Sequence, residues 1–579
     1  MTLLTFYLLP FRRSFLTGFW VLALSGLAMS AAFAQTVPPS VSPGQIQKRF
    51  EEQAPAPPSA PMLQLPTPSE APLSKEMQEQ LSKKQFVLKE VVIEDSTVYS
   101  PADLKFAYEN MIGKTISMLD AEGIASQITH LYHTDGYVLS QAIVPPQDVS
   151  NGVLKIRVIE GYVGNTIIRG DVSDDERKVI QDYADHITGL RPVRTQDLER
   201  YLLLINDLPG ATVSGLLRPS SEGTGSADLV LTLSRKRFDG SYTLDDRGSK
   251  YIGPWQHTFA VAANSIIDSY DRTQLRMFTS SPNVDELFGV ELSHQENLDS
   301  EGTMLNLLAS HTHTHPQDSL TSLDLNGQSN LFEAQVTHPF IRMRQENLIG
   351  RATFDYHDTI TDIFRSTPFT YDRLRVARIG GNYNIIDPWY GNNTADLQMS
   401  QGLDMLGATD SGTNRSNANG DASFTKFNGT LSRLQPLPEK FSLLTAGTGQ
   451  YSFQPLLADE QFSLGGPDWA RAFDPAELLG DRGLAGKTEL RYTDLVGQPY
   501  LDSYQLYGFY DIGHVWVLQG AAGANNNTTL SSIGAGTRMT FTQNFSGNLE
   551  IAVPLISDAV DQTSYRGSAR VFGSLVAKF

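Results

Sequence analysis

The spacing of hydrophobic and polar positions changes once along this chain. Between about residue 86 and residue 236, apolar residues recur every three or four positions between short β-branched runs, which predicts helices alternating with strands. From about Arg237 to Phe579 they alternate every second position, in runs of roughly ten residues separated by Gly, Asn, Asp, Ser and Thr. The pattern therefore predicts α+β modules followed by a large all-β domain.

The first part contains two copies of one small α/β unit, over 81–163 and 164–236. Each copy is predicted to have the order β-α-α-β-β. In the first copy the expected elements are a strand over 86–93, helices over 100–113 and 119–133, and strands over 137–144 and 154–158. In the second they are a strand over 166–168, helices over 174–186 and 196–208, and strands over 211–217 and 227–233.

The second part, 237–579, has the pattern of a transmembrane β-barrel. In the run 504–516, period two places Leu506, Gly508, Tyr510 and Ile512 on one face and Gln505, Tyr507, Asp511 and Gly513 on the other. The first face suits lipid and the second a wet lumen, because an aspartate facing hydrocarbon is costly. The length suits about 16 tilted strands. Length alone does not exclude a barrel of twelve or eighteen strands. Alternation alone does not exclude a soluble β-sandwich or β-helix.

The N-terminus has the pattern of a secretory signal peptide. Arg12 and Arg13 precede an apolar stretch over 15–28, and Ala32 and Ala34 are small residues at the positions that a signal peptidase reads. Cleavage is expected before Gln35, which removes 1–34; the alternative is a retained membrane anchor. No later run is long and apolar enough for a membrane helix, so any further membrane span must be made of strands.

Residues 35–80 are predicted to be an extended tether, because 10 of the 30 prolines lie between residues 36 and 73. One segment inside it has a helix signal. Ser42 is a capping residue, Pro43 suits the first helical position, and Gln45 stands where a capping box needs it. Ile46 and Phe50 would share one face of a helix over 42–53. The alternative is a transient turn in a linker.

Composition excludes several classes of function. The chain has 579 residues, a formal net charge of −19 and no cysteine, which excludes disulfide scaffolds, thiolate metal sites and cysteine nucleophiles. The acidic balance argues against binding to nucleic acid. No cofactor and no metal site is expected.

Two short motifs imitate other chemistry. The segment 481–488 is close to a phosphate-binding loop, but Asp481 stands in place of the first glycine and a strand pattern follows where a helix is required. His311, His313 and His315 could share one side of a strand and hold a transition metal, although an exposed strand end is the simpler interpretation. No triad or nucleophile-elbow pattern is present, so we expect no enzyme.

Three further stretches resemble a known family. These are Gly136-Tyr137-Val138 with Val144-Pro145-Pro146-Gln147 and the run 152–161, then the run 198–210 ending in Leu208-Pro209-Gly210, and Leu244-Asp245-Asp246 with Gly248 and Gly253. They are similar to the POTRA domains and the barrel entry of two-partner secretion outer-membrane transporters, the TpsB family of the haemolysin secretion/activation type, in the POTRA-barrel superfamily. The resemblance extends from the tether to the last residue.

The resemblance also implies the functional residues. The segment from Phe462 to Phe473 resembles the inward-folded lid loop, expected around 462–486, with Gly465 and Gly466 on its approach and Arg471 and Phe473 at its tip. The tip usually reads Val-Arg-Gly followed by Tyr or Phe, so Ala470 and Ala472 depart from the pattern, and loss of the glycine is expected to disturb a tight turn. The motif of Gly508, Asp511 and Gly513 resembles the barrel-strand partner of the lid arginine. Phe579 would be the C-terminal assembly signal.

The implied function is export of an unfolded secreted partner through the barrel. The partner would be a β-helical haemolysin or adhesin, recognised by POTRA domains in the periplasm, with the lid loop and the 42–53 plug helix closing the pore at rest. Outer-membrane lipid, the barrel-assembly machinery and periplasmic chaperones would be further partners. A barrel-assembly insertase of the same superfamily and a passive porin are the alternatives.

Overall fold

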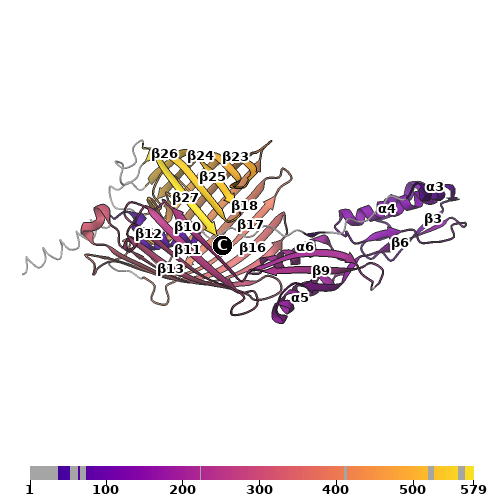
Figure 1. The fold of residues 1–579 in the computed structure, drawn as a ribbon, viewed down its shortest axis with the longest axis horizontal. Coiled ribbons are helices and arrows are strands. Elements are labelled where there is room, and N and C mark those ends of the chain that lie inside the picture. Colours follow the sequence, from indigo (N-terminus) through magenta and orange to yellow (C-terminus); the bar gives the residue numbers. More distant parts are fainter. Residues whose placement is uncertain are drawn as a thin grey trace, which may run out of the picture.

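The computed structural model describes residues 37–52, 63–64, 74–221, 223–409, 414–519, 527–557 and 568–579. It consists of a closed barrel with an arm of two α/β units extending from one end (Figure 1). The predicted signal peptide lies outside the described residues. Within them, no helix is long and apolar enough to cross a membrane.

Sixteen antiparallel strands close the barrel, as the alternation predicts. They are β10 (Phe238–Asp245), β11 (Trp255–Asn264), β12 (Arg272–Ser281), β13 (Leu287–Asn297), β14 (Met304–Thr314), β15 (Asn326–Arg342), β16 (Glu346–Ile363), β17 (Thr367–Ile386), β18 (Asn392–Gly402), β19 (Thr425–Pro436), β20 (Phe441–Ser452), β23 (Arg482–Gln498), β24 (Leu501–Trp516), β25 (Asn527–Thr542), β26 (Phe545–Ser557) and β27 (Arg570–Lys578). Each strand pairs with its neighbours in this order, and β27 returns to β10. We call the β10–β27 junction the seam.

The second unit of the arm is a four-stranded sheet covered by two helices. It contains β1 (Leu63–Gln64) from the tether, β7 (Tyr162–Arg169), α5 (Asp174–Thr188), α6 (Thr195–Asp207), β8 (Ala211–Pro219) and β9 (Ser226–Arg235). Ser173 and Glu176 cap α5 reciprocally, which satisfies backbone N–H groups at its start. The apolar faces of both helices pack on the sheet in one core that includes Ile180, Tyr183 and Leu202.

The first unit has the same strand pairing, with β3 parallel to β6 and β5 antiparallel to β6. Its elements are α3 (Lys75–Lys83), β2 (Gln85–Val87), β3 (Glu90–Glu94), η2 (Lys105–Ala107), η3 (Glu109–Met111), β4 (Thr115–Ser117), α4 (Met118–Thr134), β5 (Gln141–Ile143) and β6 (Val153–Ile159). Ser74 caps α3, so this helix begins before residue 81.

The helix expected over 100–113 is wrong. The segment forms the two 3₁₀ turns η2 and η3, separated by Tyr108 at φ −138°. A helix this short is marginal in water. Packing of Leu104, Ala107 and Tyr108 into the core of the first unit therefore decides the conformation.

The second unit is docked by polar contacts on turns at one end of the barrel. Arg342 forms a two-bond ion pair with Asp207, at 2.6 Å for both N–O contacts. Glu301, in the turn between β13 and β14, accepts hydrogen bonds from Arg200 at 3.0 Å and Tyr201 at 2.9 Å. Burial alone would raise the pKa of Glu301, but these hydrogen bonds and the nearby His186 lower it overall.

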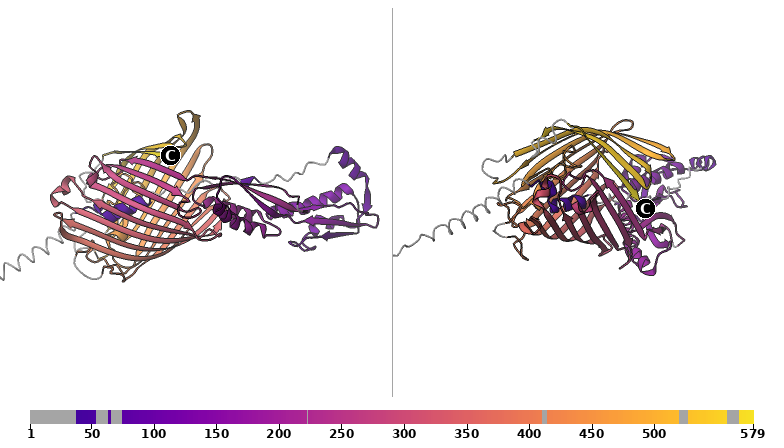
Figure 2. Two further views of the ribbon diagram at one scale, coloured as in Figure 1. Left: turned by 60° about the horizontal axis from the view of Figure 1, so that its bottom comes forward. Right: turned by 60° about the vertical axis from the view of Figure 1, so that its left-hand side comes forward.

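Two segments fill the barrel interior. The helix α2 (Pro43–Glu52) lies inside the barrel, where Figure 2 shows it in indigo behind the strands. The chain between β20 and β23, residues 453–481, folds inward and contains η6 (Ala458–Glu460), β21 (Phe462–Leu464) and β22 (Leu478–Gly480). We call residues 453–481 the inward loop; it ends before 486, because Arg482 already begins β23.

Candidate functional site: the inward loop and the lumen helix

The N-terminal part of the inward loop, which we call its near end, is fixed to the wall of the lumen by ion pairs and a hydrogen bond. Glu460 lies 2.6 Å from Arg378 of β17 and 2.7 Å from Lys426 of β19. Asp459 accepts a hydrogen bond of 2.5 Å from Thr359 of β16. Glu460, Lys426, Asp459 and Thr359 are buried, and Arg378 is partly exposed. Removal of Glu460 would leave Lys426 without its carboxylate partner away from bulk water.

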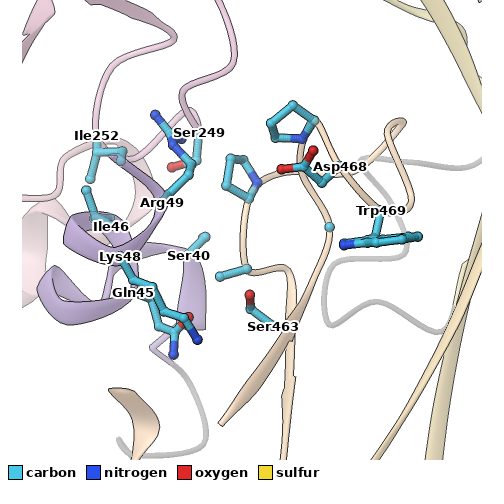
Figure 3. A pocket seen from close by; sticks show the side chains of 14 residues that line it. Ser40, Gln45, Ile46, Lys48, Arg49, Ser249, Ile252, Ser463, Asp468 and Trp469 are labelled. Atoms are coloured by element: carbon cyan, nitrogen blue, oxygen red, sulfur yellow. The ribbon is translucent and has the colours of Figure 1, made fainter. Parts of the chain in front are cut away.

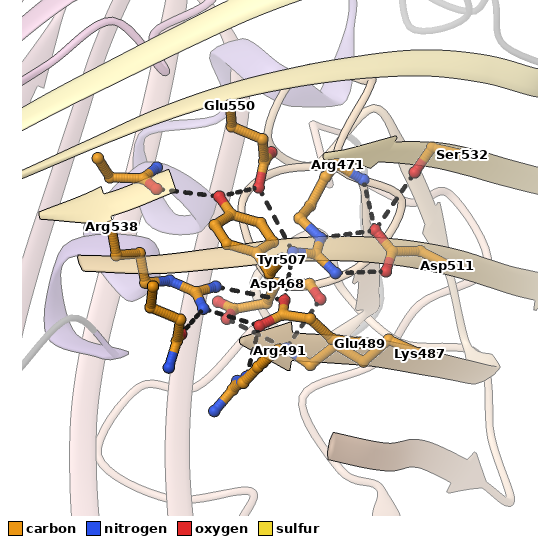
Figure 4. A network of polar contacts seen from close by, with 12 residues as sticks. Asp468, Arg471, Lys487, Glu489, Arg491, Tyr507, Asp511, Ser532, Arg538 and Glu550 are labelled. Carbon is orange, nitrogen blue, oxygen red and sulfur yellow. Dashed lines mark hydrogen bonds and ion pairs between the residues drawn. The ribbon is translucent and has the colours of Figure 1, made fainter. Parts of the chain in front are cut away.

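The tip of the inward loop is held by Arg471 on a second part of the wall, formed by β23, β24 and β26. Its Nε and Nη2 donate to the two carboxylate oxygens of Asp511 on β24, each at 2.9 Å. Its Nη1 donates to Glu489 of β23 at 2.9 Å and to Glu550 of β26 at 3.4 Å (Figure 4). The guanidinium also lies 3.5 Å from the centroid of the Phe509 ring. Arg471 therefore joins three strands to one loop.

The turn at the tip has an unusual backbone. Ala470 has φ +58°, the left-handed region that disfavours residues with a Cβ, whereas Ala472 is not among the residues with positive φ. The expected problem at Ala472 therefore does not arise, and the conformational cost falls on Ala470. Phe473, 1% exposed, packs in the core of the inward loop.

Glycines allow the loop to approach itself and the wall. Gly465 and Gly466 have φ +110° and +107°, and a Cβ on Gly465 would lie 2.3 Å from the carbonyl oxygen of Asp474. A Cβ on Gly513 of β24 would lie 2.4 Å from Leu464 of the loop. Gly508 instead faces outward, with nothing nearer than 3.9 Å, so the structure separates it from the other members of the motif.

Several residues at this site were not singled out from the sequence. Glu489, Glu550 and Phe509 contact Arg471 directly, and Glu460 fixes the near end. Period two could have placed Glu489 and Glu550 in the lumen, because each alternates with outward apolar residues in its strand. No comparable signal marks Glu460, which lies in an irregular loop.

The helix α2 spans the residues predicted from its capping pattern. Phe50 stacks on Phe278 of β12 with ring centroids 4.0 Å apart, and Ile46 is 4% exposed in the same cluster. Gln45 does not complete a capping box; its Nε2 donates to the carbonyl oxygen of Ala458 in the inward loop at 2.6 Å. The helix is therefore held by the wall and by the loop.

Small cavities remain around α2. One of about 70 Å³ lies between α2 and the inward loop, and Figure 3 shows Arg49 and Ser249 on one side of it and Asp468 and Trp469 on the other. A second of about 370 Å³ separates α2 from charged residues of the wall, including Glu333 and Arg351. The helix α2 and the inward loop thus occupy the lumen and leave cavities between them and the wall.

The tether adds a strand to the arm. The backbone of β1 (Leu63–Gln64) pairs in parallel with Gly215 and Leu216 of β8, which gives the sheet order β1-β8-β9-β7. Without β1, β8 would be an edge strand with unpaired N–H and C=O groups.

The remaining sequence motifs take structural roles. Residues 482–488 belong to β23, so the segment resembling a phosphate-binding loop runs into a strand. His311 contacts Asn330 and His315 contacts Asp324, so these two rings have separate partners. Phe579 exchanges two backbone hydrogen bonds of 3.0 Å with Gly240 at the seam.

Two family models match this chain. Residues 225–539 match the model of the haemolysin secretion/activation protein ShlB/FhaC/HecB, and residues 86–161 match the ShlB-type POTRA domain. The chain belongs to the ShlB/FhaC/HecB family. It is 26% identical over 467 residues to the heme/hemopexin transporter protein HuxB of Haemophilus influenzae 86-028NP, covering 78% of this chain and 80% of the relative.

Other relatives agree with this family. The outer membrane transporter CdiB of Dickeya dadantii is 24% identical, over 74% of this chain and 76% of the relative. The solved structure of CdiB from Escherichia coli superposes with a TM-score of 0.70 at 19% identity, covering 92% of this chain and 97% of that one. The family is one of transporters, so this chain is an outer-membrane translocator of a secreted partner protein, with its POTRA region in the periplasm.

Proposed function

We propose that this chain exports an unfolded, β-helical partner that first binds as an added strand on β8. The pairing of β1 with β8 supports this proposal, because it shows that this edge accepts an extended segment through backbone hydrogen bonds. Such pairing depends little on side chains and suits a partner that is still unfolded.

In this proposal, the partner and the tether compete for one edge. Binding of the partner displaces residues 63–64, which lie in the same tether that follows α2. Release of the tether then frees α2 to leave the lumen. The inward loop has to leave as well, because contacts of Glu460 and of Arg471 hold it inside the lumen.

Driving force is expected from the partner itself. Folding of a long β-helix outside the cell buries apolar surface and makes return through the pore unfavourable. The barrel-assembly machinery and periplasmic chaperones would act earlier, when this chain enters the membrane, with Phe579 as part of the assembly signal.

Site-specific crosslinking tests the recognition step. The chain has no cysteine, so Ser214→Cys on the exposed face of β8 provides a single attachment point for a photoreactive group. We expect crosslinks to the N-terminal domain of the partner, taken from the adjacent reading frame. The matched control is Arg169→Cys on β7, at the other edge of the same sheet, where few crosslinks are expected. Equal crosslinking at both positions would contradict recognition at β8.

Deletion of residues 37–73 tests the competition. Without the tether, β8 is free, and the partner domain should bind the purified chain more tightly. Unchanged affinity would show that the tether does not compete. A passive porin predicts no binding in either experiment, and a barrel-assembly insertase predicts binding of barrel strands in place of the secreted domain.

A further inference from the structure

The seam has the shortest strand ladder of the barrel wall, which Gly240 and Phe579 extend by two backbone hydrogen bonds. The ladder between β10 and β27 contains five residue pairs, from Ser241–Lys578 to Asp245–Ser574, whereas β10–β11 and β26–β27 each contain eight. Beyond Asp245, the next residue also connects the two strands. The backbone N–H of Asp246 donates to the carbonyl oxygen of Gly573, and the Asp246 carboxylate accepts from the N–H of Gly573 at 2.8 Å.

Two arginines flank this end of the seam, one on each side. Arg247 follows β10, and Arg570 begins β27. Both guanidinium groups lie near the ring of Phe572, with Cζ to centroid distances of 3.7 Å and 4.9 Å. Phe572 is 4% exposed, so this cluster is packed against the interior of the barrel.

Both arginines also bind the tip of the inward loop. Arg247 donates to the carbonyl oxygen of Arg471 at 3.0 Å, and Arg570 donates to that of Ala472 at 3.1 Å. Arg570 further pairs with Asp474 at 2.7 Å. Two successive carbonyl groups of the loop are therefore bound from the two sides of the seam.

We infer that Arg247 and Arg570 position the tip of the inward loop as a strap across the seam, so that undocking of the loop loosens the β10–β27 junction. The inference rests on the proposed movement of the loop. The strap acts through hydrogen bonds to backbone carbonyls, which any residue at 471 or 472 would supply. These carbonyl contacts are distinct from the pair of Arg471 with Asp511 on β24, although Arg247 also pairs with Glu550 at 2.6 Å and so shares that carboxylate with Arg471.

Coupling of the loop to the seam would allow the pore to widen when the loop undocks. A loop that leaves the lumen would remove a plug and at the same time relax the ladder with the fewest residue pairs. The wall could then widen at the seam for a bulky segment of the partner.

Hydrogen–deuterium exchange on the full-length chain in lipid nanodiscs tests the strap. In the Arg247→Gln/Arg570→Gln variant, amides of residues 241–245 and 573–578 should exchange about tenfold faster than in the wild type, while those of β15 and β16 keep their rate. Arg433→Gln is the control, because Arg433 pairs with Asp387 at a turn far from the seam. Unchanged exchange at the seam in a correctly inserted double variant would overturn the inference.

A disulfide across the seam provides an independent measurement. Thr243 and Val576 are paired neighbours, so Thr243→Cys/Val576→Cys can be added to the double variant. We expect the double variant to show raised conductance in planar bilayers and the oxidised disulfide to lower it again. Equal conductance in the oxidised and reduced forms would overturn the strap. Neither experiment uses the partner, so a failure of the proposed export function would appear in secretion and leave these results unaffected.

Discussion

Arg471 and Asp511 are 40 residues apart in sequence and form a two-bond ion pair inside the barrel, with both partners almost fully buried. We expect Arg471→Ala to undock the tip of the inward loop, because Asp511 would lose the arginine that pairs with it. Glu489 would keep its pairs with Arg491 and Arg538, and Glu550 its pair with Arg247. Breaking a buried pair in this way costs about 3 to 5 kcal/mol. Secretion of the partner should fall while the barrel still inserts, as judged by heat-modifiable migration.

Asp511→Asn in the Arg471→Ala background is the matched test of that pair. Removing the second charge should recover part of the loss, since no unpaired carboxylate then remains at 511. Normal export by Arg471→Ala alone would contradict the role of the pair.

Ala470→Gly should stabilise the docked loop. Ala470 has φ +58°, and replacement by glycine relieves an unfavourable left-handed conformation worth about 1 kcal/mol. The variant should conduct less often than the wild type in planar bilayers. Ala472→Gly is the control, because Ala472 does not have a positive φ and gains nothing from the change. More frequent opening of Ala470→Gly would show that the backbone there is not strained.

Phe50→Ala should release α2 from the lumen. The stacked contact with Phe278 is lost, and truncation of a buried phenylalanine costs about 3 to 5 kcal/mol. Conductance should rise toward that of a chain lacking 42–53. Met77→Ala in α3, where the side chain is 46% exposed, is the control and should leave conductance unchanged. If the chain lacking 42–53 has the same conductance as the wild type, α2 does not limit the pore.

Acid should destabilise the first unit through Glu160. Its carboxylate accepts hydrogen bonds from Thr97, Val98 and Tyr132. Burial alone would raise the pKa of Glu160, but these hydrogen bonds lower it below the ordinary value of 4.5. Because the folded pKa is the lower one, the stabilisation is complete above pH 4.5 and is lost as the pH falls through the lowered value.

Thermal unfolding of residues 74–236, followed by circular dichroism, measures this effect. The wild-type fragment should lose more stability between pH 7 and pH 3 than Glu160→Gln, which should be less stable at pH 7 by about 1 kcal/mol. The same pH dependence in both would contradict the assignment to Glu160.

How much the sequence could predict depends on whether a residue lies in a periodic element. Period two alone placed Asp511 and Gly513 in the lumen, and the same rule explains why Gly508 faces outward although it shares their motif. The helix over 42–53 followed from Ser42 and Pro43. By contrast, the 3₁₀ turns over 105–111 replaced a predicted helix, because tertiary packing outweighs propensity in a short segment.

Contacts made by irregular backbone were beyond sequence reasoning. Glu460 and Asp474 lie in a loop without periodicity, so nothing marks which part of the wall they reach. Arg247 and Arg570 bind carbonyl oxygens, a type of contact that leaves no side-chain signature in the partner segment.

The polar docking of the second unit on the barrel has a directional consequence. Two ion pairs hold that unit at the mouth of the pore, one between Arg342 and Asp207 and one between Arg200 and Glu301. A partner strand bound to β8 would therefore have a defined orientation relative to the opening of the pore. The orientation of the partner would thus be fixed before transport begins.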